Sequence, residues 1–178
     1  LIRDRLADDS DPFSGDNGDV EADETYVGGK APGGKRGRGA DKKTAVFGMA
    51  QRQGGVKVRV VADVKAKTVM PILEASVEKG ATVHTDEFIV YDTLPKRGYQ
   101  HKRIMHGLKV YVDGDVHTNT IEGFWALVKT GIVGVFHGVS AKHLQRYLNE
   151  YAFRYNHRKD VTPMFWSFMS RVGVKLAL

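Results

Sequence analysis

Residues 44–64, "TAVFGMAQRQGGVKVRVVADV", decide the fold. Two runs rich in apolar and β-branched residues, 44–52 and 56–64, flank a short turn of Gln and Gly at 53–55. Runs of this length and composition around a short Gly-containing turn are typical of an antiparallel β-hairpin. A further run with strand character, 20–27, precedes them. The three runs together predict an antiparallel meander.

Helical and strand patterns alternate after this meander. The predicted elements are a helix at 68–80 with Thr68 as its N-cap and Gly80 just past its end, a strand at 81–87, a short helix at 88–98 ending before Pro95, a strand at 99–106, helices at 121–131 and 140–158, and a C-terminal helix with Pro163 near its start. A meander followed by strand–helix alternation predicts an α/β fold, in which a mixed sheet is covered by helices.

Composition and charge limit the function classes. The 178 residues include no Cys, which excludes disulfides and thiolate metal sites, and no apolar run is long enough for a membrane span. Residues 1–24 hold nine acids and two arginines, so residues 25–178 carry a net charge of +13. Such a basic body indicates a polyanionic partner, most simply double-stranded DNA, although solvated surface lysines are the alternative.

A basic, Gly-rich segment lies between the first two predicted strands. This segment, 30–43, cannot bury enough apolar surface to order itself, but it could follow a phosphate backbone. The alternative is a flexible hairpin tip. The residues that we expect to contact DNA here are Lys30, Lys35, Arg36, Arg38, Lys42 and Lys43.

The predicted helix in "HTNTIEGFWALVKTG" (117–131) has two unlike faces. At about 100° per residue, Asn119, Glu122 and Lys129 lie within an arc of about 80°. A bulky stripe occupies the opposite face, and it consists of Ile121, Phe124, Trp125 and Val128. Taken alone, the pattern also fits a surface helix with a capped N-terminus and polar residues in water.

Two aspartates elsewhere change that interpretation. Asp23 and Asp86 interrupt or end apolar strands, where an acid costs stability unless it is solvated, paired or bound to a cation. Two strand carboxylates and one helix carboxylate could meet at one edge of the sheet. Such oxygen ligands suit Mg²⁺ or Mn²⁺, and two ions in one site can support phosphoryl transfer.

The spacing of these acids is similar to a known signature. Thirty-five residues separate Asp86 from Glu122, and Lys129 follows Glu122 by seven. This pattern resembles that of DDE transposases and retroviral-type integrases. Four segments, "ADETYVGGK", "HTDEFIVYDTL", "HTNTIEGFWALVK" and "YLNEYAFRYNHR", together resemble the catalytic domain of a bacterial insertion-sequence group related to the Merlin transposons.

The resemblance implies a fold, a chemistry and a set of site residues. It implies an RNase H-like sheet with helices on both faces, and DNA transposition through two-metal cleavage and 3′-hydroxyl strand transfer. Asp23 and Asp86 would bind Mg²⁺ or Mn²⁺. The third ligand would be Glu122, which a hard cation favours, or Asn119, which stands at the group's third position. Lys129 would contact DNA phosphate near the cut.

Other expectations complete the sequence-based interpretation. His84 and His117 lie two residues before Asp86 and Asn119, so they are candidates to line the site, although a structural role is the first expectation for each and no histidine metal site is predicted. We expect a helix remnant and acidic linker at 1–19, the catalytic domain at 20–160 and a packed helix at 161–178. Because the sequence begins with Leu1 and not Met, we expect a fragment or a chain whose N-terminal part is missing. With no Cys and about twenty residues before the first predicted strand, we expect the N-terminal DNA-binding segments of such transposases to lie outside this sequence.

The expected setting follows from the same resemblance. We expect a cytoplasmic, nucleoid-associated bacterial protein that binds element ends and target DNA as a homodimer or larger assembly. The alternatives are another RNase H-like nuclease and a DNA-binding remnant without catalytic activity.

Overall fold

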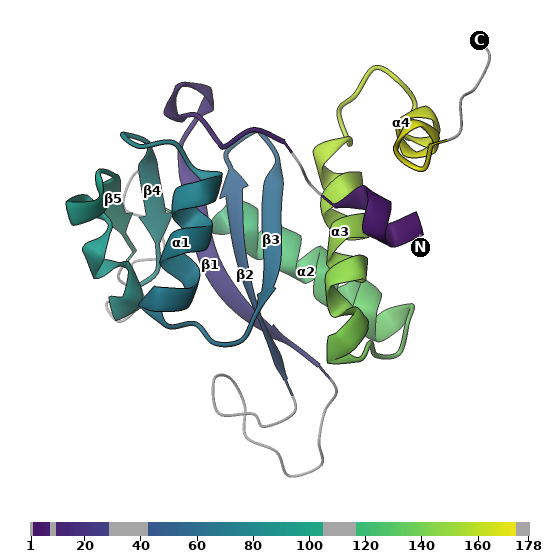
Figure 1. Cartoon of the computed structure of the whole chain (residues 1–178), viewed down its shortest axis with the longest axis horizontal. Helices are drawn as coiled ribbons and strands as arrows, with labels where there is room; N and C mark the ends of the chain where they lie inside the picture. The colour runs from purple at the N-terminus through teal and green to yellow at the C-terminus, as the bar shows by residue number, and fades with distance from the viewer. Residues whose placement is uncertain (1, 8–9, 29–42, 105–116, 174–178) are drawn as a thin grey trace.

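The computed structural model describes residues 2–7, 10–28, 43–104 and 117–173. It contains a five-stranded mixed sheet in the order β3-β2-β1-β4-β5. Helix α1 lies in front of this sheet in Figure 1, α2 crosses behind it, and α3 runs beside β3. The expected RNase H-like α/β fold, with helices on both faces, is therefore confirmed.

The antiparallel meander forms as predicted. It consists of β1 (Val20–Val27), β2 (Thr44–Gln51) and β3 (Val56–Val61). All residues of β2 after Thr44 are buried, because helices cover both faces of this central strand. That double burial explains why β2 is a continuous apolar run and not an alternation of apolar and polar residues.

The parallel part of the sheet follows α1 (Ala66–Ser76). Strand β4 (Thr82–Thr85) pairs in parallel with the start of β1, and β5 (Gln100–Arg103) pairs in parallel with β4. The order of the strands thus reverses between β1 and β4. In open α/β sheets, binding sites lie at such a switch point, beyond the carboxyl ends of the strands.

Two hydrophobic cores hold the helices on the sheet. The core on the α1 face includes Phe47, Met49 and Leu73. The other core joins the sheet to α2 (Asn119–Gly134) and α3 (Ala141–Asn156). Alternate residues of β2 serve the two cores, as the period of two in a strand requires.

Two side-chain amides from α3 cover the outer edge of β3. Gln145 accepts a hydrogen bond from Val60 N (2.7 Å) and donates to the Val58 carbonyl (3.1 Å). Asn156 pairs in the same way with the N–H (2.7 Å) and carbonyl (3.1 Å) of Val56. These amides take the place of a neighbouring strand for four backbone groups of this edge, which leaves fewer groups free to pair with another chain.

The chain ends carry short helices. Residues Ile2–Leu6 form a 3-10 helix against α3, where Arg3 donates to Glu150 (2.6 Å) and lies over the Tyr147 ring. A second 3-10 turn spans Gly15–Asn17, and α4 (Met164–Arg171) begins directly after Pro163, as expected. The predicted boundaries between 19 and 20 and between 160 and 161 stay predictions.

Several predicted helix bounds differ from the structure. Helix α1 begins at Ala66 because Lys65 is its N-cap, and the Thr68 hydroxyl donates to Asp63 (2.6 Å) from inside the first turn. The segment 88–98 forms two 3-10 helices, Ile89–Thr93 and Pro95–Arg97, in place of one helix ending before Pro95. Proline has no N–H to lose at the start of a helix, so Pro95 can begin the second one.

In the described residues, no helix is both long enough and apolar enough to cross a membrane.

Candidate active site

Asp23 lies on the face of β1 that packs against α2. The indole Nε1–H of Trp125 donates a hydrogen bond to Asp23 Oδ2 (3.0 Å). Gly48 is the β2 partner of Asp23, and a Cβ there would lie 2.5 Å from the Trp125 ring. Glycine at this position therefore gives the indole room to lie against the sheet and reach the carboxylate.

Asp86 lies beside Asp23 because of the strand register. Val20 pairs with Val83 and Glu21 with His84, and Asp86 follows just beyond the end of β4, near enough to Asp23 for its charge to raise the pKa of Asp23. The Phe88 N–H donates to Asp86 Oδ1 (2.9 Å), which fixes the carboxylate in a turn onto its own backbone. The two predicted aspartates thus meet at the switch point of the sheet.

The pKa of Asp23 reports on this proximity. The pKa of Asp23 is raised from its ordinary value of 3.8 to about 7, chiefly by burial and then by the negative charges of Glu24 and Asp86. Hydrogen bonds from the Glu24 backbone and the Trp125 indole oppose this rise. A carboxylate that is desolvated and repelled by its neighbours is stabilised by a bound cation or by a proton.

Glu24 is an acid near the pair that the sequence interpretation did not single out. It follows Asp23 in the strand, so its side chain lies on the opposite face of β1. There the buried Tyr91 hydroxyl donates to Glu24 Oε2 (2.9 Å), and burial followed by the charge of Glu24 raises the pKa of Tyr91. The adjacent acids "DE" at 23–24 could have pointed to Glu24 in the sequence. Its partner Tyr91 could not be found in this way, because it lies in a 3-10 helix that is distant in the sequence.

The polar triplet of α2 lies on its exposed side. Asn119, Glu122 and Lys129 are exposed, whereas the bulky stripe beginning with Ile121 is buried in the core, so the predicted division of the helix into two faces is confirmed. Glu122 Oε1 accepts a hydrogen bond from the Thr118 hydroxyl (2.7 Å). Helix α2 also starts earlier than predicted, at Asn119.

The donor chemistry of the aspartate pair fits a divalent cation, since both residues offer hard oxygen ligands and Asp23 is both desolvated and repelled by neighbouring carboxylates. Across the part of the chain that the structure describes, no three His, Asp or Glu side chains are grouped as a metal-binding cluster. The structure therefore brings Asp23 and Asp86 together. The convergence of Glu122 or Asn119 on them stays a prediction.

The two histidines predicted near the site take part in a polar network beside it. His84 is fully buried, its Nε2 lies 2.7 Å from Asp19 Oδ2, and burial lowers its pKa. His117 Nδ1 lies 3.2 Å from Glu21 Oε1 but out of line for a hydrogen bond. Sequence reasoning did not identify Glu21 as part of this network.

The predicted DNA contacts fall mostly outside the described residues. Lys43 is half-buried just before β2, and Lys129 is exposed on α2. The others lie in the stretch 29–42, which is outside the described part of the chain, and they are Lys30, Lys35, Arg36, Arg38 and Lys42.

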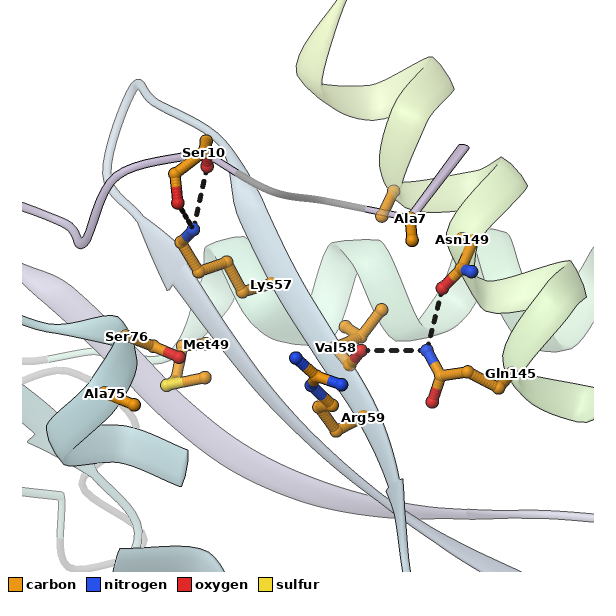
Figure 2. Close-up of a pocket in the computed structure, with 11 residues that line it drawn as sticks. Ala7, Ser10, Met49, Lys57, Val58, Arg59, Ala75, Ser76, Gln145 and Asn149 are labelled. Carbon is orange, nitrogen blue, oxygen red and sulfur yellow. Dashed lines mark hydrogen bonds between the residues drawn. The ribbon is translucent and has the colours of Figure 1, made fainter. Parts of the chain in front are cut away.

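A separate cavity of about 250 Å³ lies between β3, α1, α3 and the N-terminal segment (Figure 2). Lys57 reaches across its rim and donates to the Ser10 carbonyl and hydroxyl (2.9 and 2.7 Å), and Gln145 lines the opposite side. None of the predicted site residues lines this cavity. The aspartate pair, and not this cavity, therefore defines the candidate active site.

Comparisons with known proteins find transposase-related sequences. The model of the ISXO2-like transposase domain family matches residues 16–156. An uncharacterized transposase-like protein of Haemophilus influenzae is 32% identical over 97 residues, which cover 54% of this chain and 77% of that protein. An uncharacterized protein in transposable element ISH50 of Halobacterium salinarum is 34% identical over 155 residues.

The match with the Halobacterium protein covers 77% of this chain but only about half, 52%, of that relative's length. No solved structure matches this chain.

Proposed function

This chain belongs to the ISXO2-like transposase domain family, and from that premise we propose that it is the DNA-cleaving and strand-transferring domain of an insertion-sequence transposase. The observation that carries the proposal is the proximity of Asp23 and Asp86 at the switch point of the sheet. Metal-assisted phosphoryl transfer needs oxygen ligands to hold the metal ions, and two carboxylates at this place would supply them.

The two aspartates would hold Mg²⁺ or Mn²⁺, with Glu122 or Asn119 completing the ligand set. Two such ions, when bound, would activate the attacking oxygen and stabilise the leaving oxygen of the phosphodiester. Trp125 holds the Asp23 carboxylate in place through its indole N–H, and the backbone N–H of Phe88 does the same for the Asp86 carboxylate. Both carboxylates are thereby oriented before any ligand arrives.

The proposed reaction has two steps that use one site. Water attacks the phosphorus at the element end, and the bond from phosphorus to the 3′-oxygen breaks. Water loses a proton in this step, and the leaving 3′-oxygen takes one up and becomes a 3′-hydroxyl. That hydroxyl then attacks a target phosphodiester, forming a new P–O bond and releasing a target 3′-hydroxyl. Lys129 and the basic segment at 30–43 would neutralise the phosphates of element end and target.

The partner is then double-stranded DNA, and two chains or more would be assembled when both element ends are joined. The family and the net charge of +13 in residues 25–178 support this proposal. A cellular location at the bacterial nucleoid would follow from the same partner.

The test is a cleavage and strand-transfer assay with the purified protein. The substrate is plasmid DNA carrying the sequences that flank the gene on both sides, incubated with Mg²⁺ or with a chelator. We expect Mg²⁺-dependent 3′-hydroxyl ends and joined products with the wild type and with the exposed-carboxylate control Asp11→Asn. Asp23→Asn and Asp86→Asn should give neither.

Two outcomes would contradict the proposal. Hydrolysis of an RNA strand alone would identify another RNase H-like nuclease. DNA binding by all four proteins without cleavage by any of them would identify a DNA-binding remnant.

A further inference from the structure

Glu21 is a fully buried carboxylate on the same face of β1 as Asp23. Its exposed fraction is 0%. Since successive residues in a strand rise about 3.3 Å, Glu21 lies about 6.6 Å along the strand from Asp23. A buried carboxylate is costly unless it is fully paired, so its partners indicate what it does.

The partners of Glu21 are the first backbone groups of α2. Oε2 accepts hydrogen bonds from Thr120 N (2.8 Å) and Ile121 N (3.0 Å), and Oε1 accepts one from the Thr120 hydroxyl (3.0 Å). These two N–H groups are those that an N-cap side chain normally binds. A negative charge at this end of a helix is also favoured by the helix dipole.

The residue at the N-cap position itself does not perform this task. Thr118 makes no side-chain capping bond, and its hydroxyl donates to Glu122. Glu21, a residue of β1, caps the helix in place of Thr118. The Thr118 hydroxyl instead binds Glu122, which is a candidate third metal ligand. The cap thus couples β1 directly to the turn that carries Asn119 and Glu122.

Arg52 completes the connection. Its Nε donates to Glu21 Oε1 (3.0 Å), and its Nη2 donates to the His117 carbonyl (2.8 Å), in the segment that leads into α2. The same Nη2 lies 3.4 Å from His84 Nδ1 on β4. Glu21 and Arg52 therefore join β1, the turn after β2, β4 and α2, which are the elements around the aspartate pair.

A stabilising role alone does not account well for this arrangement. Buried ion pairs are frequently no more stabilising than apolar residues of the same size, and their best supported use is to fix one geometry. Here, side-chain hydrogen bonds fix the position of α2 on β1 at two places. Glu21 holds the first turn of the helix, and Trp125 contacts Asp23 one turn later.

We propose that Glu21, supported by Arg52, is a positioning residue that sets the first turn of α2 so that Asn119 and Glu122 are presented to the site of Asp23 and Asp86. This inference rests on the proposed function for its catalytic consequence. Its structural part, the placement of α2 on β1, can be measured without any cleavage.

The experiment compares Glu21→Gln and Glu21→Ala with the wild type, all in a Trp166→Phe background. Trp166 and Trp125 are the two tryptophans of the chain, so one indole N–H resonance then reports on Trp125 at its contact with Asp23. Gln keeps the length and one carbonyl oxygen but loses the charge that faces Arg52. Ala removes the cap and is expected to have the larger effect.

We expect both variants to shift the Trp125 indole resonance. We also expect cleavage to fall by about 10–100-fold, the usual cost of losing an outer partner at a metal site, and half-maximal cleavage to need more Mn²⁺. DNA affinity should stay within about twofold, because the fully buried Glu21 side chain cannot contact a phosphate. If Glu21→Ala does not fold, Glu21→Gln carries the test.

The matched control is Asn156→Ala. It also removes two side-chain hydrogen bonds to backbone, but at the far edge of β3. We expect it to lower the melting temperature while the Trp125 resonance and the Mn²⁺ dependence stay at wild-type values. An equal loss of cleavage in this control would reduce Glu21 to a stabilising residue.

The outcomes for the two proposals are distinguishable. An active protein whose indole resonance and Mn²⁺ dependence are unchanged in Glu21→Gln would overturn the positioning role. A wild type that cleaves no DNA would overturn the proposed function, while the resonance would still decide whether Glu21 places α2.

Discussion

Trp125 donates its indole N–H to the Asp23 carboxylate across the interface between α2 and the sheet (3.0 Å). One residue of the buried stripe thus has two tasks, since its ring packs in the core and its nitrogen holds a candidate ligand. The helix that supplies the proposed third ligand is tied to the strand that supplies the first. Several measurable consequences follow from this connection.

Replacing Asp23 should stabilise the protein in a pH-dependent way. Because its pKa is raised from 3.8 to about 7, the folded state binds the proton more tightly than the unfolded state does. Stability from this group is present at low pH and is lost as pH rises through about 7. Asp23→Asn should therefore exceed the wild type in free energy of unfolding by on the order of 4 kcal/mol at pH 8.

Urea unfolding at pH 5 and pH 8 measures this difference. The gap between variant and wild type should be wide at pH 8 and narrow at pH 5. A gap that is the same at both pH values would show that the Asp23 carboxylate is not destabilised in the fold.

Gly48→Ala should disturb the contact between Trp125 and Asp23. The added Cβ would lie 2.5 Å from the indole, so the ring must move, at a cost of about 1–3 kcal/mol for overpacking. Cleavage should fall together with stability because the carboxylate loses its donor. Thermal melts and the cleavage assay measure the two effects.

The control for this change is Gly123→Ala in α2, where a Cβ would meet no atom within 4 Å. It should stabilise the helix at this exposed position by up to about 1 kcal/mol and leave cleavage intact. Equal behaviour of the two alanine variants would contradict the role of Gly48.

The third ligand can be identified by comparing Glu122→Gln with Asn119→Ala. A carboxylate is the better ligand for a hard cation, so we expect Glu122→Gln to lower cleavage by about 100-fold and Asn119→Ala to lower it less. Thr130→Ala, on the exposed side of the same helix, is the control. Wild-type activity of Glu122→Gln would refute the assignment of Glu122.

DNA binding should depend steeply on salt through the basic segment at 30–43. Each phosphate contact contributes about 0.9 to the slope of log affinity against log salt. Replacing Lys35, Arg36 and Arg38 with alanine should therefore reduce the slope by about 2–3, whereas Lys67→Ala on α1 should not change it. Fluorescence anisotropy at several salt concentrations measures the slope, and an unchanged slope in the triple variant would remove this segment from the interface.

Much of the fold was predictable because it depends on local patterns. The apolar run of β2 and the buried stripe of α2 show the strand and helix periods directly. The bounds were less accurate where a cap decided them, as at Lys65 before α1 and at the start of α2. Those ends depend on which polar groups the folded chain brings near.

The candidate site was predictable in part for the same reason. Asp23 and Asp86 stood out as acids in apolar strands, and the sheet register places them together. The parts that sequence reasoning missed are contacts between distant segments. The capping of α2 by Glu21 joins residues about a hundred positions apart, and the contact of Tyr91 with Glu24 joins two elements with no local pattern in common.

The central claim, that Asp23 and Asp86 form the cation site, is tested most directly by Mn²⁺ binding. The loss of the free Mn²⁺ signal in electron paramagnetic resonance can be followed by titration for the wild type, Asp23→Asn, Asp86→Asn and the control Asp11→Asn. We predict equal binding by the wild type and the control, and affinities at least about tenfold weaker for the two site variants. Equal Mn²⁺ binding by all four proteins would contradict the account.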